Sequence, residues 1–295
     1  MHERAAAYFR ELQDRLTAAI ESLDGPGRFR EDLWDRPGGG GGRTRILCEG
    51  SVFENAGVNF SDVFGEFSEE FAQQVPGEGR QFSATGVSLV LHPRNPYVPT
   101  IHANFRFLTK GSKQWFGGGT DLTPYYPFRE DVIHFHRTLR TVCARHAPAV
   151  DYTRMKVDCD RYFFLPHRGE ARGVGGIFFD YSECDLEKTL TFVRDCGTAI
   201  LPAYEPIVER RRDLPYGERQ REFQLFRRGR YVEFNLLCDR GTLFGLKTGG
   251  RIESILMSLP AVARWEYDWR PEAGTAEAML SELFLPPRDW AAEID

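Results

Sequence analysis

The spacing of hydrophobic residues along the chain predicts both long helices and strands. From residue 3 to 23, apolar residues such as Tyr8, Leu12 and Leu16 recur every three or four positions, and a Gly-Pro-Gly stop follows. The same spacing predicts helices over 129–147, 151–164, 186–212 and around 275–284. Alternation with a period of two predicts strands over 44–60, 81–92, 100–109, 174–180 and 230–237, with a weaker strand over 241–247.

The order of these elements indicates the fold class. The predicted strands cluster in the first half of the chain with short connections, and they do not alternate strictly with helices. We therefore expect an α+β fold with a large, mainly antiparallel sheet instead of a doubly wound parallel one. The glycine run 38–42 is expected to be a mobile or substrate-ordered loop, because consecutive glycines sacrifice too much backbone freedom in a helix or strand.

One predicted strand carries a row of polar side chains on a single face. Within 101–107 the apolar residues point to one side, whereas His102, Asn104 and Arg106 point to the other. The preceding strand contributes Ser88 and His92, and a proline-rich connection can turn it alongside. Two histidines, an amide and a guanidinium together indicate a binding or catalytic site. The alternative is an ordinary solvated face of an antiparallel sheet, and it stays open at this stage.

Four histidines are candidate ligands for a metal ion. His136 lies in the apolar stripe of the predicted helix 129–147, and His167 lies where an apolar segment passes into a loop. Together with His92 and His102 they can supply imidazoles to a divalent cation, although the chain has neither H-E-x-x-H nor a two-histidine, one-carboxylate pattern at short spacing. For His136 the alternative is a core residue that is hydrogen-bonded and does nothing else.

Two glycine-rich segments are further candidates. Three glycines at 117–119 permit close backbone approach, and Asp121 is expected at a rigid turn that Pro124 ends, where it is either a general base or a partner for backbone donors of the turn. In Thr248-Gly249-Gly250-Arg251, two glycines expose backbone N–H groups and the arginine adds a fork that matches carboxylate geometry. A plain turn has the same sequence pattern.

Composition and charge narrow the class of partner. A net charge of −5 gives no bulk attraction for nucleic acid, and the arginine-rich stretch 209–230 is expected to form solvated helix faces. The six cysteines show no C-x-x-C spacing and are expected to be reduced thiols. No long apolar run or signal-like start is present, so we expect no membrane span and a cytoplasmic protein. No nucleotide-binding motif occurs.

Several long strings resemble one family, the oxygen-dependent coproporphyrinogen III oxidases of haem synthesis. The matching strings include AGVNFS (56–61), GVSLVLHPRNPYVPTIHANFRF (86–107), WFGGGTDLTPYY (115–126), YFFLPHRGEARGVGGIFFD (162–180) and GGRIESILMSLP (249–260). They follow one another in order over nearly the whole chain. The resemblance implies a single catalytic domain over 1–295, a broad antiparallel sheet with helices on both sides, and a homodimer whose contact includes 231–266.

The resemblance also implies a reaction and its residues. Two propionate side chains of coproporphyrinogen III become vinyl groups, with O2 as co-substrate, CO2 and H2O2 as products and no organic cofactor. His102 is implied as proton donor, Arg106 as catalytic and Asp121 as the group that holds the pyrrole N–H. The implied substrate contacts are Ser88, Asn104, Arg106, Gly249, Gly250 and Arg251. The positions implied to bind a divalent metal cation are His92, His102, His136 and His167.

Two other functions remain open from the sequence. In one, the histidines form a non-haem metal oxygenase site. In the other, the chain is a porphyrin carrier in which Arg106 and Arg251 hold propionates, while His102 and Asp121 take no part.

Overall fold

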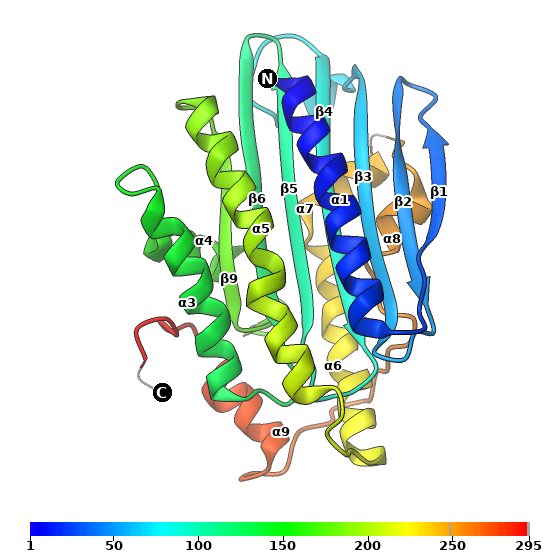
Figure 1. Cartoon of the computed structure of the whole chain (residues 1–295), viewed down its shortest axis with the longest axis vertical. Helices are drawn as coiled ribbons and strands as arrows, with labels where there is room; N and C mark the ends of the chain where they lie inside the picture. Colours follow the sequence, from blue (N-terminus) through cyan, green and yellow to red (C-terminus); the bar gives the residue numbers. More distant parts are fainter. Residues whose placement is uncertain (248, 294–295) are drawn as a thin grey trace.

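The computed structural model describes residues 1–247 and 249–293; Thr248, part of one candidate segment, lies outside the described residues. Within them, seven strands form one antiparallel sheet in the order β1-β2-β3-β4-β5-β6-β9 (Figure 1). Its strands are β1 (Arg30–Asp35), β2 (Gly40–Cys48), β3 (Phe53–Glu66), β4 (Gln81–Pro93), β5 (Thr100–Lys110), β6 (Lys113–Thr123) and β9 (Gly175–Ser182). A separate small hairpin pairs β7 (Phe164–Leu165) with β8 (Glu170–Ala171).

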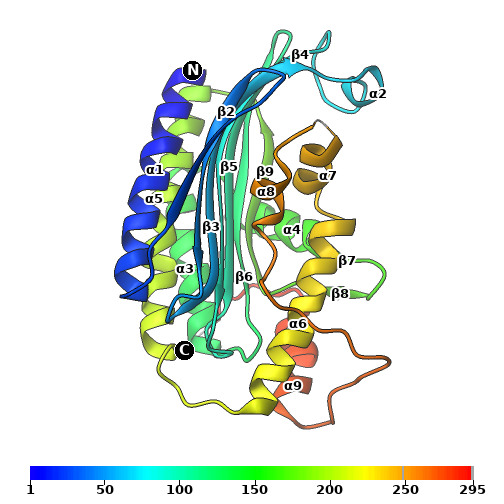
Figure 2. The same cartoon turned by 90° about the vertical axis from the view of Figure 1, so that its right-hand side faces the viewer.

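Helices cover the sheet on both faces, as Figure 2 shows in side view. On one face lie α1 (His2–Asp24), α3 (Arg129–Arg145) and α5 (Leu186–Arg211). On the other lie α4 (Tyr152–Tyr162), α6 (Glu218–Leu237), α7 (Arg240–Lys247), α8 (Ile252–Leu256) and α9 (Ala276–Met279), which continues into a π-helical turn at Leu280–Phe284. A short helix, α2 (Glu69–Ala72), precedes β4. The expected α+β fold with a mainly antiparallel sheet between two helical layers is confirmed.

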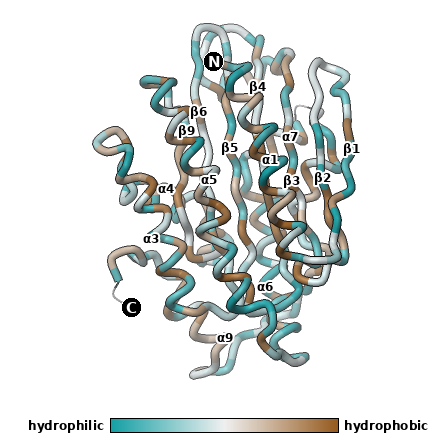
Figure 3. Tube along the Cα trace, in the orientation of Figure 1, coloured by the Kyte–Doolittle hydropathy of each residue, from teal (hydrophilic) through white to brown (hydrophobic). Residues whose placement is uncertain are grey.

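The main core lies between the sheet and the α1, α3, α5 layer. Apolar residues of the strands, such as Leu89 and Phe105, are buried against helix residues such as Phe9 and Leu12. Figure 3 shows the hydrophobic and hydrophilic residues alternating along these three helices, as expected for helices with one buried face. Each fully buried large apolar side chain contributes roughly 1.5–3 kcal/mol to the stability of the fold. The apolar face of each strand therefore packs against these helices, and the other face points away from them.

The predicted strands over 230–237 and 241–247 are wrong, because both segments are helical. In α6 the buried residues Phe223, Phe226 and Phe234 continue a helical spacing that begins well before 230. The predicted strand rested on eight residues only, and over so short a segment the apolar positions of a helix can appear to alternate. In α7, the Asp239 carboxylate accepts the Thr242 backbone N–H at 2.7 Å, which satisfies a donor at the helix start.

The expectation of a loop over the whole glycine run 38–42 is also wrong, because Gly40, Gly41 and Gly42 begin strand β2. Gly40 has a φ of +77°, which favours glycine. A Cβ at Gly42 would collide with the Trp34 indole and lie 2.5 Å from the Phe60 carbonyl oxygen. The glycines therefore allow neighbouring strands and a tryptophan to approach closely, and this gain in packing outweighs their entropic cost.

None of the helices in the described ranges has the length and apolar content that a membrane-spanning helix needs.

Candidate active site

A row of polar residues crosses five neighbouring strands on the face opposite the main core. Each member pairs in register with the next, and directly opposed residues point to the same side of a sheet. We call these residues the polar row: Asp32, Thr44, Asn59, Ser88 and Asn104. The row covers four interstrand spacings, or about 19 Å. His102 and Arg106 flank Asn104 on β5, and Ser88 and His92 lie four residues apart on β4. The five residues predicted to converge therefore share one face, although His92 is fully buried.

His102 is paired with Asp121 on the neighbouring strand. The two residues are opposite each other in the β5–β6 ladder, and His102 Nδ1 lies 2.8 Å from Asp121 Oδ1. The Asp121 side chain is only 1% exposed, whereas that of His102 is 22% exposed. A carboxylate can only accept, so Nδ1 donates, and in the neutral form of the ring Nε2 carries the lone pair. Within the described residues Nε2 has no hydrogen-bond partner, so it is available to a ligand.

Arg172 holds the other side of Asp121. Its Nη2 donates to both carboxylate oxygens, at 2.9 and 2.7 Å, and its Nη1 donates to Asn235 Oδ1 at 3.0 Å. The guanidinium lies 4.1 Å from the ring centre of Phe163 and 4.4 Å from that of Tyr231, in cation–π range. Aromatic rings thus exclude water from the Asp121–Arg172 ion pair.

Burial and ion pairing oppose each other at Asp121 and Arg172, and ion pairing prevails. Burial alone raises the pKa of Asp121, but the Arg172 charge and the hydrogen bond from His102 lower the pKa below its usual value. Burial likewise lowers the pKa of Arg172, yet the Asp121 carboxylate leaves that pKa raised overall. Both groups are therefore charged at neutral pH.

The structure places Asp121 in strand β6, so the predicted turn at Asp121 is wrong. The preceding glycines serve the packing of three strands: a Cβ at Gly118 would lie 2.6 Å from the Asn104 carbonyl oxygen, and one at Gly119 would collide with the Ile177 carbonyl oxygen. Both oxygens of Asp121 are already occupied by His102 and Arg172. Asp121 consequently lies behind His102 and is not exposed as a base that a ligand can reach.

Arg106 is poised for an anion at one end of the polar row. Its Nη1 donates to Asn104 Oδ1 at 3.0 Å, and its Nη2 lies 2.8 Å from Asp180 Oδ2. The side chain is 29% exposed, so part of the guanidinium remains open to a ligand. A Cβ at Gly117 would lie 2.8 Å from Arg106 Nη2, which explains a glycine at this position.

Gly249, Gly250 and Arg251 approach the other end of the polar row. Gly249 adopts a φ of +67°, and Arg251 precedes α8 and forms an ion pair with Asp32 of β1. The Ser254 hydroxyl of α8 lies 2.7 Å from that of Thr44. Helix α8 therefore covers the β1–β2 end of the row, while Arg106 lies at the β5 end. The two arginines predicted to bind substrate are on the same face but at opposite ends.

The four candidate metal ligands do not gather around one point. In the part of the chain that the structure describes, no three His, Cys, Asp or Glu side chains are arranged to hold a metal ion. His136 is fully buried, with Nδ1 2.8 Å from the Tyr152 hydroxyl and Nε2 3.1 Å from the Val174 carbonyl oxygen. His92 likewise contacts the Thr100 hydroxyl and the Ser258 carbonyl oxygen. His167 lies at the surface beside Glu233. These residues do not fit a shared metal ion.

The two buried histidines predict an acid-sensitive fold. Burial, assisted by nearby positive charge, lowers the pKa of both His92 and His136 to about 3. In the unfolded chain each takes up a proton with a pKa near 6.5, so their contribution to the pH dependence is negligible above about pH 7.5. As the pH falls from 6.5 to 3, the unfolded state binds protons first, and each histidine costs about 1.4 kcal/mol of stability per pH unit.

Urea unfolding at pH 6.5 and pH 5.0 measures this effect. For the unaltered chain the free energy of unfolding is expected to fall by roughly 3 kcal/mol from these two residues. In His136→Gln the drop between the two pH values should be about 1.7 kcal/mol smaller. Equal drops in both proteins would show that His136 is not buried and neutral.

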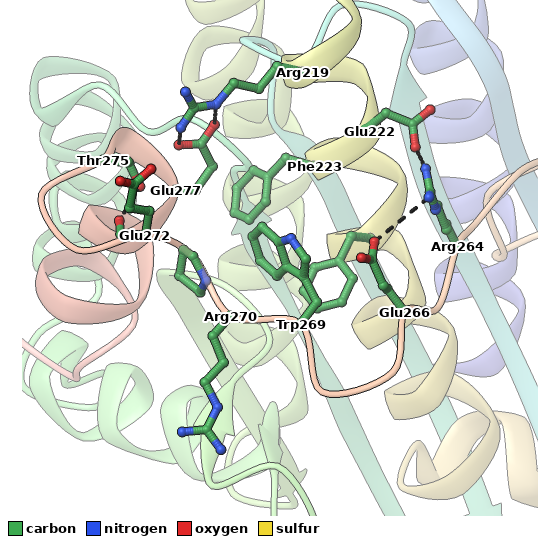
Figure 4. Close-up of a pocket in the computed structure, with 12 residues that line it drawn as sticks. Arg219, Glu222, Phe223, Arg264, Glu266, Trp269, Arg270, Glu272, Thr275 and Glu277 are labelled. Atoms are coloured by element: carbon green, nitrogen blue, oxygen red, sulfur yellow. Dashed lines mark hydrogen bonds and ion pairs between the residues drawn. The ribbon is translucent and has the colours of Figure 1, made fainter.

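A separate cavity of about 310 Å³ lies against the first half of α6 (Figure 4). Phe223, Phe226 and Trp269 supply its apolar surface. Around them, charged groups pair with one another: Arg219 with Glu277 at 2.8 Å, and Arg264 with Glu222. None of the site residues predicted from the sequence lines this cavity.

Sequence reasoning missed several residues of the site. Arg172 lies in the segment after β8, and its side chain reaches Asp121 on β6. No motif or residue spacing in the sequence indicates this contact. Asn59 shares the alternation of β3, between the buried residues Val58 and Phe60, and that alternation is a usable signal. Asp180 alternates in the same way after the buried Phe179.

A comparison with protein families agrees with the resemblance described above. The family model described as coproporphyrinogen III oxidase matches residues 4–290 of the 295, nearly the whole chain.

Proposed function

Because the chain belongs to the coproporphyrinogen III oxidase family, enzymes that decarboxylate coproporphyrinogen III in haem synthesis, we propose that it carries out the oxygen-dependent form of this reaction. In this form each of two propionates loses CO2 and becomes a vinyl group. The C–C bond to the carboxylate breaks, and a proton leaves the side-chain carbon that is bonded to the pyrrole ring. The two electrons released reduce O2, which takes up this proton and one from solvent to give H2O2.

The cysteines favour O2 over an iron–sulfur centre as the electron acceptor. Iron–sulfur clusters are held by cysteine thiolates at short, regular spacings, and the chain has no C-x-x-C. Cys143, Cys159 and Cys196 are buried, and burial raises the pKa of each thiol, which disfavours the thiolate that a cluster needs.

The observation that carries the proposal is the chain of contacts from Arg172 through Asp121 to His102, beside Arg106. The Asp121 carboxylate fixes the His102 ring with Nε2 free, and it stabilises the imidazolium that forms when Nε2 takes up a proton. His102 is then the proton-transfer residue, able to accept a pyrrole proton and to donate it toward reduced oxygen. Asp121 is a positioning residue, which revises the sequence-based assignment of direct contact with the pyrrole N–H.

The polar row supplies contacts that suit a macrocycle with carboxylate arms. Arg106 and Arg251 offer forked guanidinium groups for propionates at the two ends of the row. Ser88 and Asn104 lie between them, half-buried, with polar groups for the ring nitrogens or a carboxylate. Gly249 and Gly250 let the backbone before α8 approach the ligand closely.

Incubation of the purified protein with coproporphyrinogen III, with and without O2, tests the proposal. We expect protoporphyrinogen IX, detected by fluorescence after oxidation, only in the aerobic sample, with two CO2 and two H2O2 for each product molecule. Equal product without O2 would contradict the role of oxygen. Tight binding without any product would favour the carrier function instead. Unchanged turnover after treatment with a chelator would contradict the alternative function as a metal oxygenase.

We also propose that the working unit is a homodimer, as expected for segment 231–266. Exposed large apolar residues are concentrated there, on and around α6, α7 and α8, and α7 contacts both of the other two helices. They are Leu236, Leu237, Leu246, Ile252, Leu256, Val262 and Trp265. Such a concentration of exposed apolar side chains supports an interface. The free thiols of the described cysteines fit a reducing compartment, and we propose the cytoplasm.

The dimer is tested by analytical ultracentrifugation of a charge substitution. Leu237 is 63% exposed, and Leu237→Glu is expected to shift the protein toward the monomer because the interface then buries an unpaired charge. Leu33→Glu is a matched control, since Leu33 is 70% exposed but lies on the edge strand β1. A dimer that tolerates Leu237→Glu, or a monomeric parent protein, would contradict the proposed interface.

A further inference from the structure

A buried asparagine of α6 links the ion pair behind His102 to the segment that follows α8. Asn235 is only 5% exposed, and both ends of its side-chain amide are hydrogen-bonded. Its Oδ1 accepts from Arg172 Nη1 at 3.0 Å, and its Nδ2 donates to the Ser258 hydroxyl at 3.2 Å. Ser258 lies just beyond the end of α8, on the same face of the sheet as α6 (Figure 2). The amide therefore joins two parts of the site.

The direction of each hydrogen bond in this chain is determined. A guanidinium only donates, so the Asn235 oxygen must face Arg172 and the amide nitrogen must face Ser258. The Ser258 hydroxyl accepts this N–H and donates its own hydrogen to the Ile255 carbonyl oxygen at 2.9 Å. Leucine branches at the same side-chain carbon as asparagine but has no polar group, so Asn235→Leu removes both links and keeps the shape.

Asn235 helps to fix the orientation of the Arg172 guanidinium. Two donations of Arg172 go to Asp121, and its Nε has no hydrogen-bond partner within the described residues. The guanidinium is thus held by Asp121 at one terminal nitrogen and by Asn235 at the other, between aromatic rings. Because Asp121 in turn fixes the His102 ring, a rotation of this guanidinium would also displace His102.

The segment after α8 is attached to the sheet as well as to Asn235. His92 Nε2 donates to the Ser258 carbonyl oxygen at 2.9 Å, and Asn55 Nδ2 donates to the carbonyl oxygen of the next residue at 2.9 Å. These two contacts hold the backbone, whereas Asn235 holds the Ser258 side chain. Arg251 precedes α8 directly, so the place of this proposed substrate contact depends on how the end of α8 is anchored.

We propose that Asn235 is a positioning residue that couples the α8 segment to the orientation of His102. This inference rests on the function proposed above. A ligand that holds α8 in place also holds Ser258, and Asn235 then restrains the ion pair behind His102. Binding at one end of the polar row and proton transfer near the other end are thereby linked through hydrogen bonds of buried groups.

Steady-state kinetics with coproporphyrinogen III test the link toward His102. Asn235→Leu is expected to lower kcat by roughly 10- to 100-fold, because a small displacement of a proton-transfer group is costly. Gln224→Met is the matched control. Gln224 is a fully buried amide of the same helix, whose oxygen accepts from Arg221 and whose Nε2 donates to the Pro93 carbonyl oxygen at 3.0 Å. Its loss should lower the Tm by a similar amount and change kcat by less than about threefold.

Two double variants show whether Asn235 acts through its two partners. When Asn235→Leu is added to Asp121→Asn, kcat should fall by less than about threefold further, since both substitutions act on His102. Coproporphyrin III, the oxidised form of the substrate, serves as the probe in fluorescence titrations. Ser258→Ala is expected to raise its Kd by about threefold, and Asn235→Leu by as much, because each removes the same hydrogen bond. The two together should raise the Kd no further.

The outcomes separate this inference from the proposed function. If the unaltered protein binds the probe and turns over, but kcat in Asn235→Leu equals that of Gln224→Met, the positioning role is overturned while the proposed function stands. Multiplicative losses with Asp121→Asn would also overturn it, and an unchanged Kd in Ser258→Ala would overturn the link to α8. Asn235→Ala, which leaves room for water beside Arg172, replaces Asn235→Leu if the latter does not fold, with the same directions expected. An unaltered protein that neither binds nor reacts would overturn the proposed function itself.

Discussion

Asp121→Asn is expected to lower kcat for coproporphyrinogen III by roughly 10²–10⁴-fold, with little change in KM. The amide keeps the shape of the carboxylate, but it neither stabilises a His102 imidazolium nor enforces the tautomer with Nε2 free. Because Asp121 is buried behind His102 and does not reach the open side of the sheet, the loss should appear in turnover and not in substrate binding.

A double variant shows whether Asp121 acts through His102. His102→Asn alone should reduce kcat to a similar extent, and the combination of both substitutions should be no slower than the slower single variant. Steady-state kinetics of the three proteins provide the comparison. Multiplicative losses in the double variant would show that Asp121 acts on the substrate independently of His102, which would restore a direct role.

Arg172→Leu is expected to destabilise the fold by about 3–5 kcal/mol, because it leaves the buried Asp121 carboxylate without its charged partner. Both side chains of the pair are at most 2% exposed, so solvent cannot replace the lost contacts. The leucine also gives up the contacts to Asn235 and to the aromatic rings. Guanidinium chloride unfolding at pH 7 measures the loss.

The pair Asp121→Asn with Arg172→Leu is the informative control. It removes both charges, so much of the stability lost in Arg172→Leu should return, while activity should stay at the level of Asp121→Asn. A double variant that is less stable than Arg172→Leu would contradict the claim that the uncompensated carboxylate is the cause. Recovered activity would contradict the role of Asp121 in positioning His102.

The sequence predicts most of the fold because the relevant signals are local. The apolar stripe of α1 and the alternation along β5 each arise from residues within one element, and the structure confirms the helix and the strand that they predict. The strand predicted over 230–237 is wrong because a short apolar run fits either period. The longer stripe of α6 and the packing of Phe234 with Phe163 and Leu165 favour the helix.

The sequence predicts only the part of the site that lies on one strand. His102, Asn104 and Arg106 lie on one strand, so alternation alone placed them on one face. Asp32 and Asn59 enter the polar row through the register of several ladders, which no single segment encodes.

Long-range packing accounts for the remaining differences. Arg172 lies 51 residues from Asp121, and its burial among aromatic rings arises only when α4, α6 and the sheet come together. For the same reason the sequence could not distinguish Asp121 as an accessible base from Asp121 as a buried partner of His102.

A crystal structure of the protein with coproporphyrin III bound is the most direct test of where the chemistry takes place. We expect the macrocycle to lie against the face that carries Ser88 and Asn104, with His102 Nε2 toward it and one carboxylate within about 3.2 Å of the Arg106 guanidinium. A porphyrin bound elsewhere, for example in the cavity beside Phe223 and Trp269, with the polar row uncovered, would contradict the account.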